Sequence, residues 1–294
     1  MVETELTEAE RRLGLAAGQF PFASRFLDFA GARLHYIDEG QGPILLMLHG
    51  NPSWSYLYRG LVLALRDEFR CIAIDLAGFG LSTPPPGFSF QPEDQAPLIA
   101  ALVDHLDLND ATLVAHDWGG PIGVAATRAT GGRIARWRLG NTWAWPVNGD
   151  FHFEWFSKLL GGRLGRFLAE RYCVFINVIL PTSMRRRKLT ATELNAFRAP
   201  FRGLQARRAM SVLPAAIAGA HDWLAGLENF VADFKGSVHF IWPENDIAFR
   251  DKELVHWRAL LPQARVTRLP KCGHFLWLET PDETAAALRA SLKP

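Results

Sequence analysis

The sequence predicts an α/β protein in which helices flank a mostly parallel central sheet. Short apolar runs, such as residues 43–48 and 71–76, alternate with segments of helical spacing. This alternation is typical of a parallel sheet covered on both faces. It stops from about residue 146 to 220, where the pattern is helical only, and then resumes. We therefore expect a main domain of residues 1–145 and 221–294, with residues 146–220 inserted as a helical cap.

The elements follow in order along the chain. After a helical start, residues 25–30 and 33–38 alternate and meet at Gly31, which predicts an antiparallel hairpin at the sheet edge. The further strands are expected at residues 43–48, 71–76, 111–115, 134–139, 238–242 and 265–269. Helices are expected at residues 54–65, 92–106, 119–130 and 252–261 and from Pro281 onward.

Composition favours a small-molecule partner. Among 294 residues 49% are hydrophobic and 21% are charged, and the net charge of +2 provides no field that would hold nucleic acid. The basic run 185–188 is interpreted as a solvated helix face. Three scattered cysteines indicate neither disulfides nor a metal site. The charged N-terminus does not resemble a secretory signal, and no apolar run is long enough to span a bilayer, so we expect a cytoplasmic protein without a membrane partner.

The stretch from Ala111 to Gly123 predicts a strand, a sharp turn and a helix, with Asp117 at the tip. A turn this tight tolerates only small side chains two positions either side, and these are Ala115 and Gly119. This is the nucleophile-elbow pattern with Asp in place of Ser. The alternative is that Asp117 only caps the helix. The same tripeptide recurs at residues 221–223 without the glycine, and Asp222 is interpreted as structural.

Four further polar residues follow separate predicted strands: Asn51, Trp118, Asp246 and His274. In an open parallel sheet, groups beyond the carboxyl ends of the strands converge. The order nucleophile, acid, histidine is that of α/β-hydrolase triads, in which the acid orients the imidazole. Glu244 and Asn245 lie close enough to Asp246 to leave the choice of acid open.

A carboxylate nucleophile implies covalent catalysis at carbon. No serine in the chain has small residues at both elbow positions, which argues against a serine esterase. Ionised Asp117 can displace a leaving group and form an ester, which water activated by His274 then hydrolyses. The backbone N–H groups of Asn51 and Trp118 are the expected oxyanion hole.

Two motifs together, 49–54 (HGNPSW) and 116–120 (HDWGG), resemble those of the haloalkane dehalogenases. The resemblance covers the main domain from about Phe20 to the end. It implies that the Trp118 indole and the Asn51 side-chain amide hold the leaving halide, that neutral haloalkane and water are the substrates, and that no metal or organic cofactor is needed. Some members place a Glu after the strand that follows the elbow helix. This chain has no carboxylate in residues 141–146, so Asp246 is the candidate acid, and this combination resembles the third subfamily.

Other functions compete with this interpretation. Epoxide hydrolases resemble this chain but use two cap tyrosines, and Tyr172 is the only tyrosine in the expected cap. Fluoroacetate dehalogenases typically carry Arg where Trp118 stands. A binding module on the same fold would usually lack part of the triad. Trp143 and Trp145 are expected either to contact halide or to pack under the cap. Five aromatic residues of the expected cap are expected either to line an apolar pocket or to form part of the core: Phe151, Phe153, Trp155, Phe156 and Phe167. The oligomeric state is not predicted.

Overall fold

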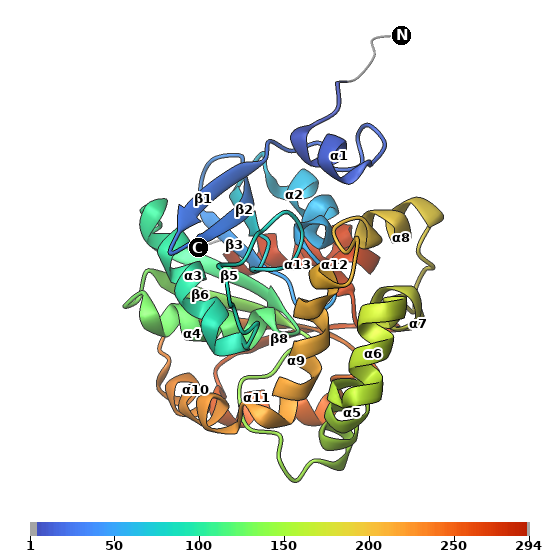
Figure 1. The fold of residues 1–294 in the computed structure, drawn as a ribbon. Helices are drawn as coiled ribbons and strands as arrows, with labels where there is room; N and C mark the ends of the chain where they lie inside the picture. Colours follow the sequence, from blue (N-terminus) through green and yellow to red (C-terminus); the bar gives the residue numbers. More distant parts are fainter. Residues whose placement is uncertain (1–4, 293–294) are drawn as a thin grey trace.

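A computed structural model describes residues 5–292 and shows an eight-stranded sheet between layers of helices (Figure 1). The strand order is β1-β2-β4-β3-β5-β6-β7-β8. β1 pairs antiparallel with β2 and β2 with β4, and all other neighbours are parallel. The bounds are β1 Arg25–Phe29, β2 Ala32–Glu39, β3 Ile44–Leu48, β4 Arg70–Ile74, β5 Ala111–His116, β6 Ile134–Gly140, β7 Ser237–Pro243 and β8 Arg265–Leu269. The predicted fold class and hairpin are confirmed.

Helices cover both faces of the sheet. α2, α12 and α13 pack together on one face, while α3, α4 and α10 pack on the other (Figure 1). The main-domain helices are α1 Glu8–Leu13, α2 Arg59–Leu65 after the 3-10 turn Ser55–Tyr58, α3 Pro92–His105, α4 Gly119–Ala129, α10 His221–Asp233, α11 Asp251–Leu260, α12 Leu276–Glu279 and α13 Pro281–Leu292. None of the helices described in residues 5–292 is long and apolar enough to cross a membrane.

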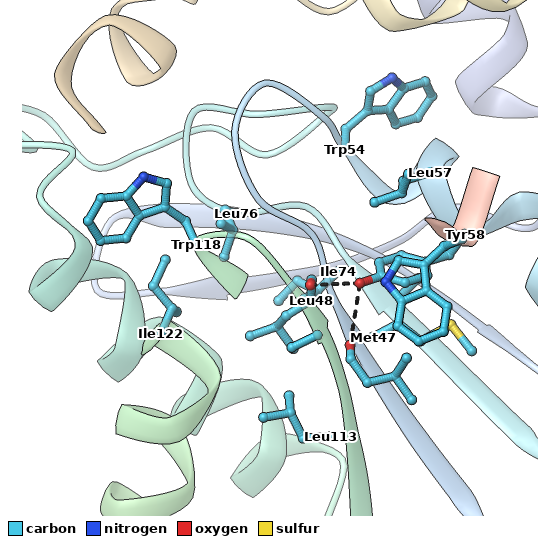
Figure 2. Close-up of a cluster of buried hydrophobic side chains, with 14 of the residues drawn as sticks. Met47, Leu48, Trp54, Leu57, Tyr58, Ile74, Leu76, Leu113, Trp118 and Ile122 are labelled. Carbon is cyan, nitrogen blue, oxygen red and sulfur yellow. Dashed lines mark hydrogen bonds between the residues drawn. The ribbon is translucent and has the colours of Figure 1, made fainter. Parts of the chain in front are cut away.

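The middle strands form the centre of the core. β5 is buried at all six positions, and β3 at four of five, because helices cover both faces of these parallel strands. Figure 2 shows Tyr58 among these side chains, where its hydroxyl donates to the Leu48 carbonyl at 2.7 Å. Leu48 is the last residue of β3, so this bond fixes the point at which the chain leaves the sheet towards Asn51.

The chain between β6 and α10 is helical. It contains α5 Phe151–Gly161, α6 Arg163–Tyr172, the π-helical turn Phe175–Ile179, α7 Leu180–Thr182, α8 Ala191–Arg198, the 3-10 turn Gln205–Arg207 and α9 Arg208–Gly219. α5 packs closely on α9, because Gly161 has no side chain and the Ala215 backbone can approach it. A Cβ at this position would lie 2.5 Å from Ala215 Cα. The Ser157 hydroxyl donates to the Pro214 carbonyl at 2.8 Å in the same contact.

A buried carboxylate attaches this helical region to the main domain. Glu279, 7% exposed, accepts from the backbone N–H groups of Arg185 and Arg186 at 2.8 and 2.7 Å through one oxygen. Its other oxygen accepts from Gly273 N at 2.9 Å. The basic run 185–188 is thus a non-helical connection, and its interpretation as a solvated helix face was wrong. Two of its arginines instead pair with Glu283 and Glu193, and the second pair is at 2.7 Å.

We expect Glu279→Gln to lower the free energy of unfolding by about 1–3 kcal/mol, because the neutral amide has one acceptor oxygen for three buried N–H groups. Urea unfolding measures this. Glu283→Gln is the control, since Glu283 lies four residues further along the chain and its side chain is half-exposed. Its ion pair with Arg186 is at the surface and contributes less than about 1 kcal/mol to the free energy of unfolding. Equal losses in both variants would contradict the special role of Glu279.

Candidate active site

The turn at Asp117 has the geometry of a nucleophile elbow. Asp117 follows β5 with φ of 52°, in the left-handed region that ordinary side chains rarely adopt. The turn passes close to the neighbouring strand, since a Cβ on Gly119 would lie 2.2 Å from the Leu48 carbonyl oxygen. Thr142 donates to the Asp117 carbonyl at 2.6 Å, and Asn141 accepts from its N–H at 2.9 Å. α4 has Trp118 at its N-cap and no side-chain cap bond, so these contacts, and not helix capping, hold Asp117 at the strand end.

Two backbone N–H groups act on the Asp117 carboxylate. Asn51 N donates to Oδ1 at 2.7 Å, and the Trp118 N–H is near enough to favour the charged form of the same carboxyl group. Burial raises the pKa of Asp117 above its ordinary value, while His274 and these two N–H groups oppose the rise. Asn51 N bonds to Oδ1 and not to Oδ2, and the imidazole nitrogen closest to Oδ2, His274 Nε2, is 3.9 Å away.

His274 lies between two carboxylates. Its Nδ1 is 2.8 Å from Asp246 Oδ2, and the Asp246 side chain is fully buried. Burial by itself lowers the pKa of His274, but Asp246 and then Asp117 outweigh it and raise that pKa above the ordinary value. Of the two carboxylates in residues 244–246, Asp246 is the one that contacts His274, and Glu244 lies 3.7 Å from Arg268 on the surface instead.

The loop that carries His274 is fixed by residues that sequence reasoning missed. His116 Nε2 donates to the His274 carbonyl at 2.8 Å. Burial lowers the pKa of His116 well below its ordinary value, so this imidazole is a neutral donor. On the other side, His274 N donates to the Ser183 carbonyl at 3.0 Å. Ser183 and Glu279 carried no signal in the sequence, because both act through backbone groups far away along the chain.

Asn51 and Trp118 lie beside the nucleophile. The Asn51 amide donates one N–H to the Met210 carbonyl at 3.2 Å, which fixes its orientation, because a flipped amide would place two oxygens face to face. A second amide N–H is left, and both residues line the same cavity. Figure 2 shows the Trp118 indole with its nitrogen on the edge away from Ile122. The Trp118 ring packs edge-on against Trp143, with centroids 4.6 Å apart.

A small cavity of about 50 Å³ joins these groups. It is lined by Asp117, His274, Asn51 and Trp118 and by apolar side chains, among them Phe156, Phe175, Ile179, Ile217, Ile247 and Phe275. None of the described tyrosines lines it, and Tyr172 is 56% exposed elsewhere. Larger hollows of about 330–630 Å³ are open to solvent and contain none of the four polar groups.

The expected aromatic pocket residues divide into three groups. Phe156 lines the cavity. Phe153 is buried near Trp143 and Phe249. Phe151, Trp155 and Phe167 are exposed, so for these three both the pocket and the core interpretation were wrong. Trp143 packs against Trp118, Trp145 packs against His256 and Trp257, and neither lines the cavity. Asp222 is fully exposed at the start of α10, as a structural residue would be.

No group of three or more His, Cys, Asp or Glu side chains within residues 5–292 is arranged to hold a metal ion. The arrangement instead places the Asp117 carboxylate, the imidazole of His274 bonded to Asp246, and the Asn51 and Trp118 side chains around an apolar space. These groups suit displacement at carbon followed by ester hydrolysis.

A protein-family model for the alpha/beta hydrolase fold matches residues 43–281. The chain is 37% identical over 272 residues to haloalkane dehalogenase 2 of Mycobacterium tuberculosis, covering 92% of this chain and 94% of the relative. It is 32% identical over 290 residues to a cis-3-alkyl-4-alkyloxetan-2-one decarboxylase of Shewanella oneidensis, covering 92% and 88%. The solved structure of haloalkane dehalogenase DbeA from Bradyrhizobium elkani matches with a TM-score of 0.82 at 24% identity, covering 92% and 97%. The chain belongs to the α/β-hydrolase family and, within it, to the haloalkane dehalogenases, hydrolases that act on carbon–halide bonds.

We expect Asp246→Asn to move the acidic limb of the pH–rate profile to lower pH and to slow turnover on the order of 10²- to 10⁴-fold. A base must be neutral, so activity rises as pH passes the His274 pKa, which Asp246 holds above about 6.5. Initial rates of halide release across pH 5–10 measure both effects. A profile of unchanged position would contradict the coupling of Asp246 to His274.

Proposed function

We propose that this protein hydrolyses small neutral haloalkanes to an alcohol, a halide ion and a proton, through an ester on Asp117. The observation that carries the proposal is that Asp117 and His274 line one apolar cavity, with His274 bonded to Asp246 at 2.8 Å. Asp117, His274 and Asp246 are the proposed catalytic residues, and the helices of residues 146–220 the proposed cap over them. Three free, buried cysteines support a reducing, cytoplasmic location.

The first step is displacement at the halogen-bearing carbon. Because Asp117 Oδ1 already accepts from Asn51 N, the other oxygen, Oδ2, is the proposed attacking atom. A bond forms from Oδ2 to carbon, and the carbon–halogen bond breaks with its electron pair on the halide. The Trp118 indole N–H and the remaining Asn51 amide N–H are the proposed halide donors.

The second step is hydrolysis of the ester. His274 takes a proton from water, and the resulting oxygen nucleophile attacks Cγ of Asp117. Oδ1 then carries negative charge, and the N–H groups of Asn51 and Trp118, which already act on the carboxylate, stabilise it. While the proton is on His274, Asp246 stabilises the imidazolium. The tetrahedral intermediate then collapses, the departing alkoxide takes the proton from His274 and leaves as the alcohol, and the Asp117 carboxyl group loses its remaining proton to solvent and is restored as the carboxylate. These steps use only side chains, backbone and water.

Epoxide opening is less well supported, because it needs a donor for the epoxide oxygen and none of the described tyrosines lines the cavity. A second candidate is decarboxylation of a β-lactone, since relatives 32% and 30% identical carry the name cis-3-alkyl-4-alkyloxetan-2-one decarboxylase. Asp117 would attack the saturated ring carbon bonded to the ring oxygen, and the bond between that carbon and oxygen would break with its electron pair on a new carboxylate. Loss of CO₂ would then form the alkene and expel the Asp117 carboxylate, with no water consumed.

One set of assays separates the three reactions. Halide release is measured with 1,2-dibromoethane and 1-bromobutane, diol formation with styrene oxide, and CO₂ and alkene with a cis-3,4-dialkyloxetan-2-one. Halide release above the rates for diol and alkene is the expected result. Alkene without halide would assign the site to the lactone reaction, and diol without halide would assign it to epoxide opening.

We expect Asp117→Ala to abolish halide release while the protein stays folded, because the nucleophile is lost but the surrounding core is unchanged. Circular dichroism and the halide assay together measure this. Asp222→Ala is the matched control, since Asp222 stands in an identical His-Asp-Trp tripeptide and is fully exposed. Retained turnover in Asp117→Ala would overturn the assignment of the nucleophile.

We expect His274→Phe to trap the ester, because the second step loses its base while the first does not need it. Intact-protein mass spectrometry after incubation with 1-bromobutane should show the mass of one butyl group. The double variant Asp117→Ala/His274→Phe should show no adduct. An unmodified His274→Phe protein would argue against the covalent route.

A further inference from the structure

Two helices of the inserted region expose large apolar side chains on the outer surface. On α5 they are Phe151 (80% exposed), Trp155 (55%) and Leu159 (45%), spaced four residues apart and therefore on one face. On α6 they are Leu164 (65%), Phe167 and Tyr172. α5 and α6 follow each other and pack together (Figure 1), and one shallow depression is lined by Trp155, Leu159 and Leu164. We call these six residues the cap patch. Monomeric proteins rarely expose so many large apolar side chains together without a binding role.

Cations surround the cap patch. Lys158, Arg163, Arg166 and Arg171 are all exposed on the same two helices, and Lys158 and Arg163 line the depression with Trp155. No carboxylate of the described residues lies within 4.0 Å of their charged groups.

The nearby acids have other partners. Glu154 accepts from Gly149 N at 2.7 Å, and Glu170 accepts from the Ser211 hydroxyl at 2.7 Å. Asp150 pairs with Arg250 and Lys252. The cap patch is therefore apolar, and the four cations of α5 and α6 outnumber the two acids of these helices, Glu154 and Glu170, by two.

We propose that the cap patch binds the surface of an anionic lipid bilayer. Aromatic and leucine side chains enter the boundary between headgroups and acyl chains, while long Lys and Arg side chains reach anionic headgroups. A basic amphipathic helix is typical of such surfaces. A second copy of the chain is the weaker candidate, because a twofold contact centred here would bring Lys158 and Arg163 against their own copies.

The cap patch lies on the outside of a helix whose other side reaches the cavity. Phe156, next to Trp155, lines the cavity, and so does Ile179, next to the exposed Val178. If the cap patch binds a bilayer, helix α5, which lines the cavity, contacts lipid in which apolar molecules dissolve. The proposal rests on surface chemistry alone and holds whichever reaction the site performs. It replaces the expectation that the protein has no membrane partner.

The test uses the full chain with vesicles of phosphatidylcholine alone or with 30% phosphatidylglycerol. Sedimentation with the anionic vesicles only, weakening at high salt, is expected. Charge reversal in Lys158→Glu/Arg163→Glu/Arg166→Glu should weaken binding by roughly tenfold or more. The matched control is Arg25→Glu/Lys235→Glu/Arg258→Glu, three exposed cations elsewhere, which should bind like the wild type.

A second readout uses Trp155, the most exposed of the ten tryptophans. Brominated lipids should quench wild-type fluorescence, and Trp155→Phe should remove that quenching. Equal binding of the two charge-reversal variants, or no binding to anionic vesicles, would overturn the proposal. If light scattering instead shows a dimer that Trp155→Ser dissociates, without vesicle binding, the cap patch is an interface between copies and the proposal is wrong.

Discussion

The left-handed backbone at Asp117 is the constraint on which the site depends. A non-glycine residue in this conformation is costly, and it persists here because the surroundings fix it. Gly119 allows the turn to approach the β3 carbonyl, and Asn141 and Thr142 hold Asp117 from the β6 side. Because β3, β5 and β6 are parallel and adjacent, the groups that fix the turn come from neighbouring strand ends. The same adjacency brings Asn51 N to the carboxylate.

The histidine is held in a different way. Its loop is bonded through main-chain atoms to His116 from β5, to Ser183 from the helical insertion and, through Gly273, to Glu279. Glu279 also binds the insertion at Arg185 and Arg186. The helices that line the cavity and the loop that carries His274 are therefore attached to each other and not only to the sheet. A change in the insertion can move the base relative to Asp117.

Several parts of this structure follow from local pattern, and others do not. The placement of Asp117, Asp246 and His274 at one edge of the sheet followed from the sequence, because each comes within five residues of the end of a predicted strand and parallel strands end at one edge. The choice of Asp246 over Glu244 needed coordinates, since residues two apart on a loop differ only in where they point. The exposed faces of α5 and α6 were not predictable: helical spacing shows an apolar face but does not show what covers it.

The sequence by itself determined the fold class, the tight turn at Asp117 and the order along the chain of Asp117, Asp246 and His274, because strand patterning, turn sterics and residue type are local properties. Tertiary structure alone decided the 2.8 Å contact between His274 and Asp246, the Met210 contact that orients Asn51, the small cavity and the exposure of the cap patch. Each of these depends on packing between segments far apart along the chain, and no local preference fixes such distances.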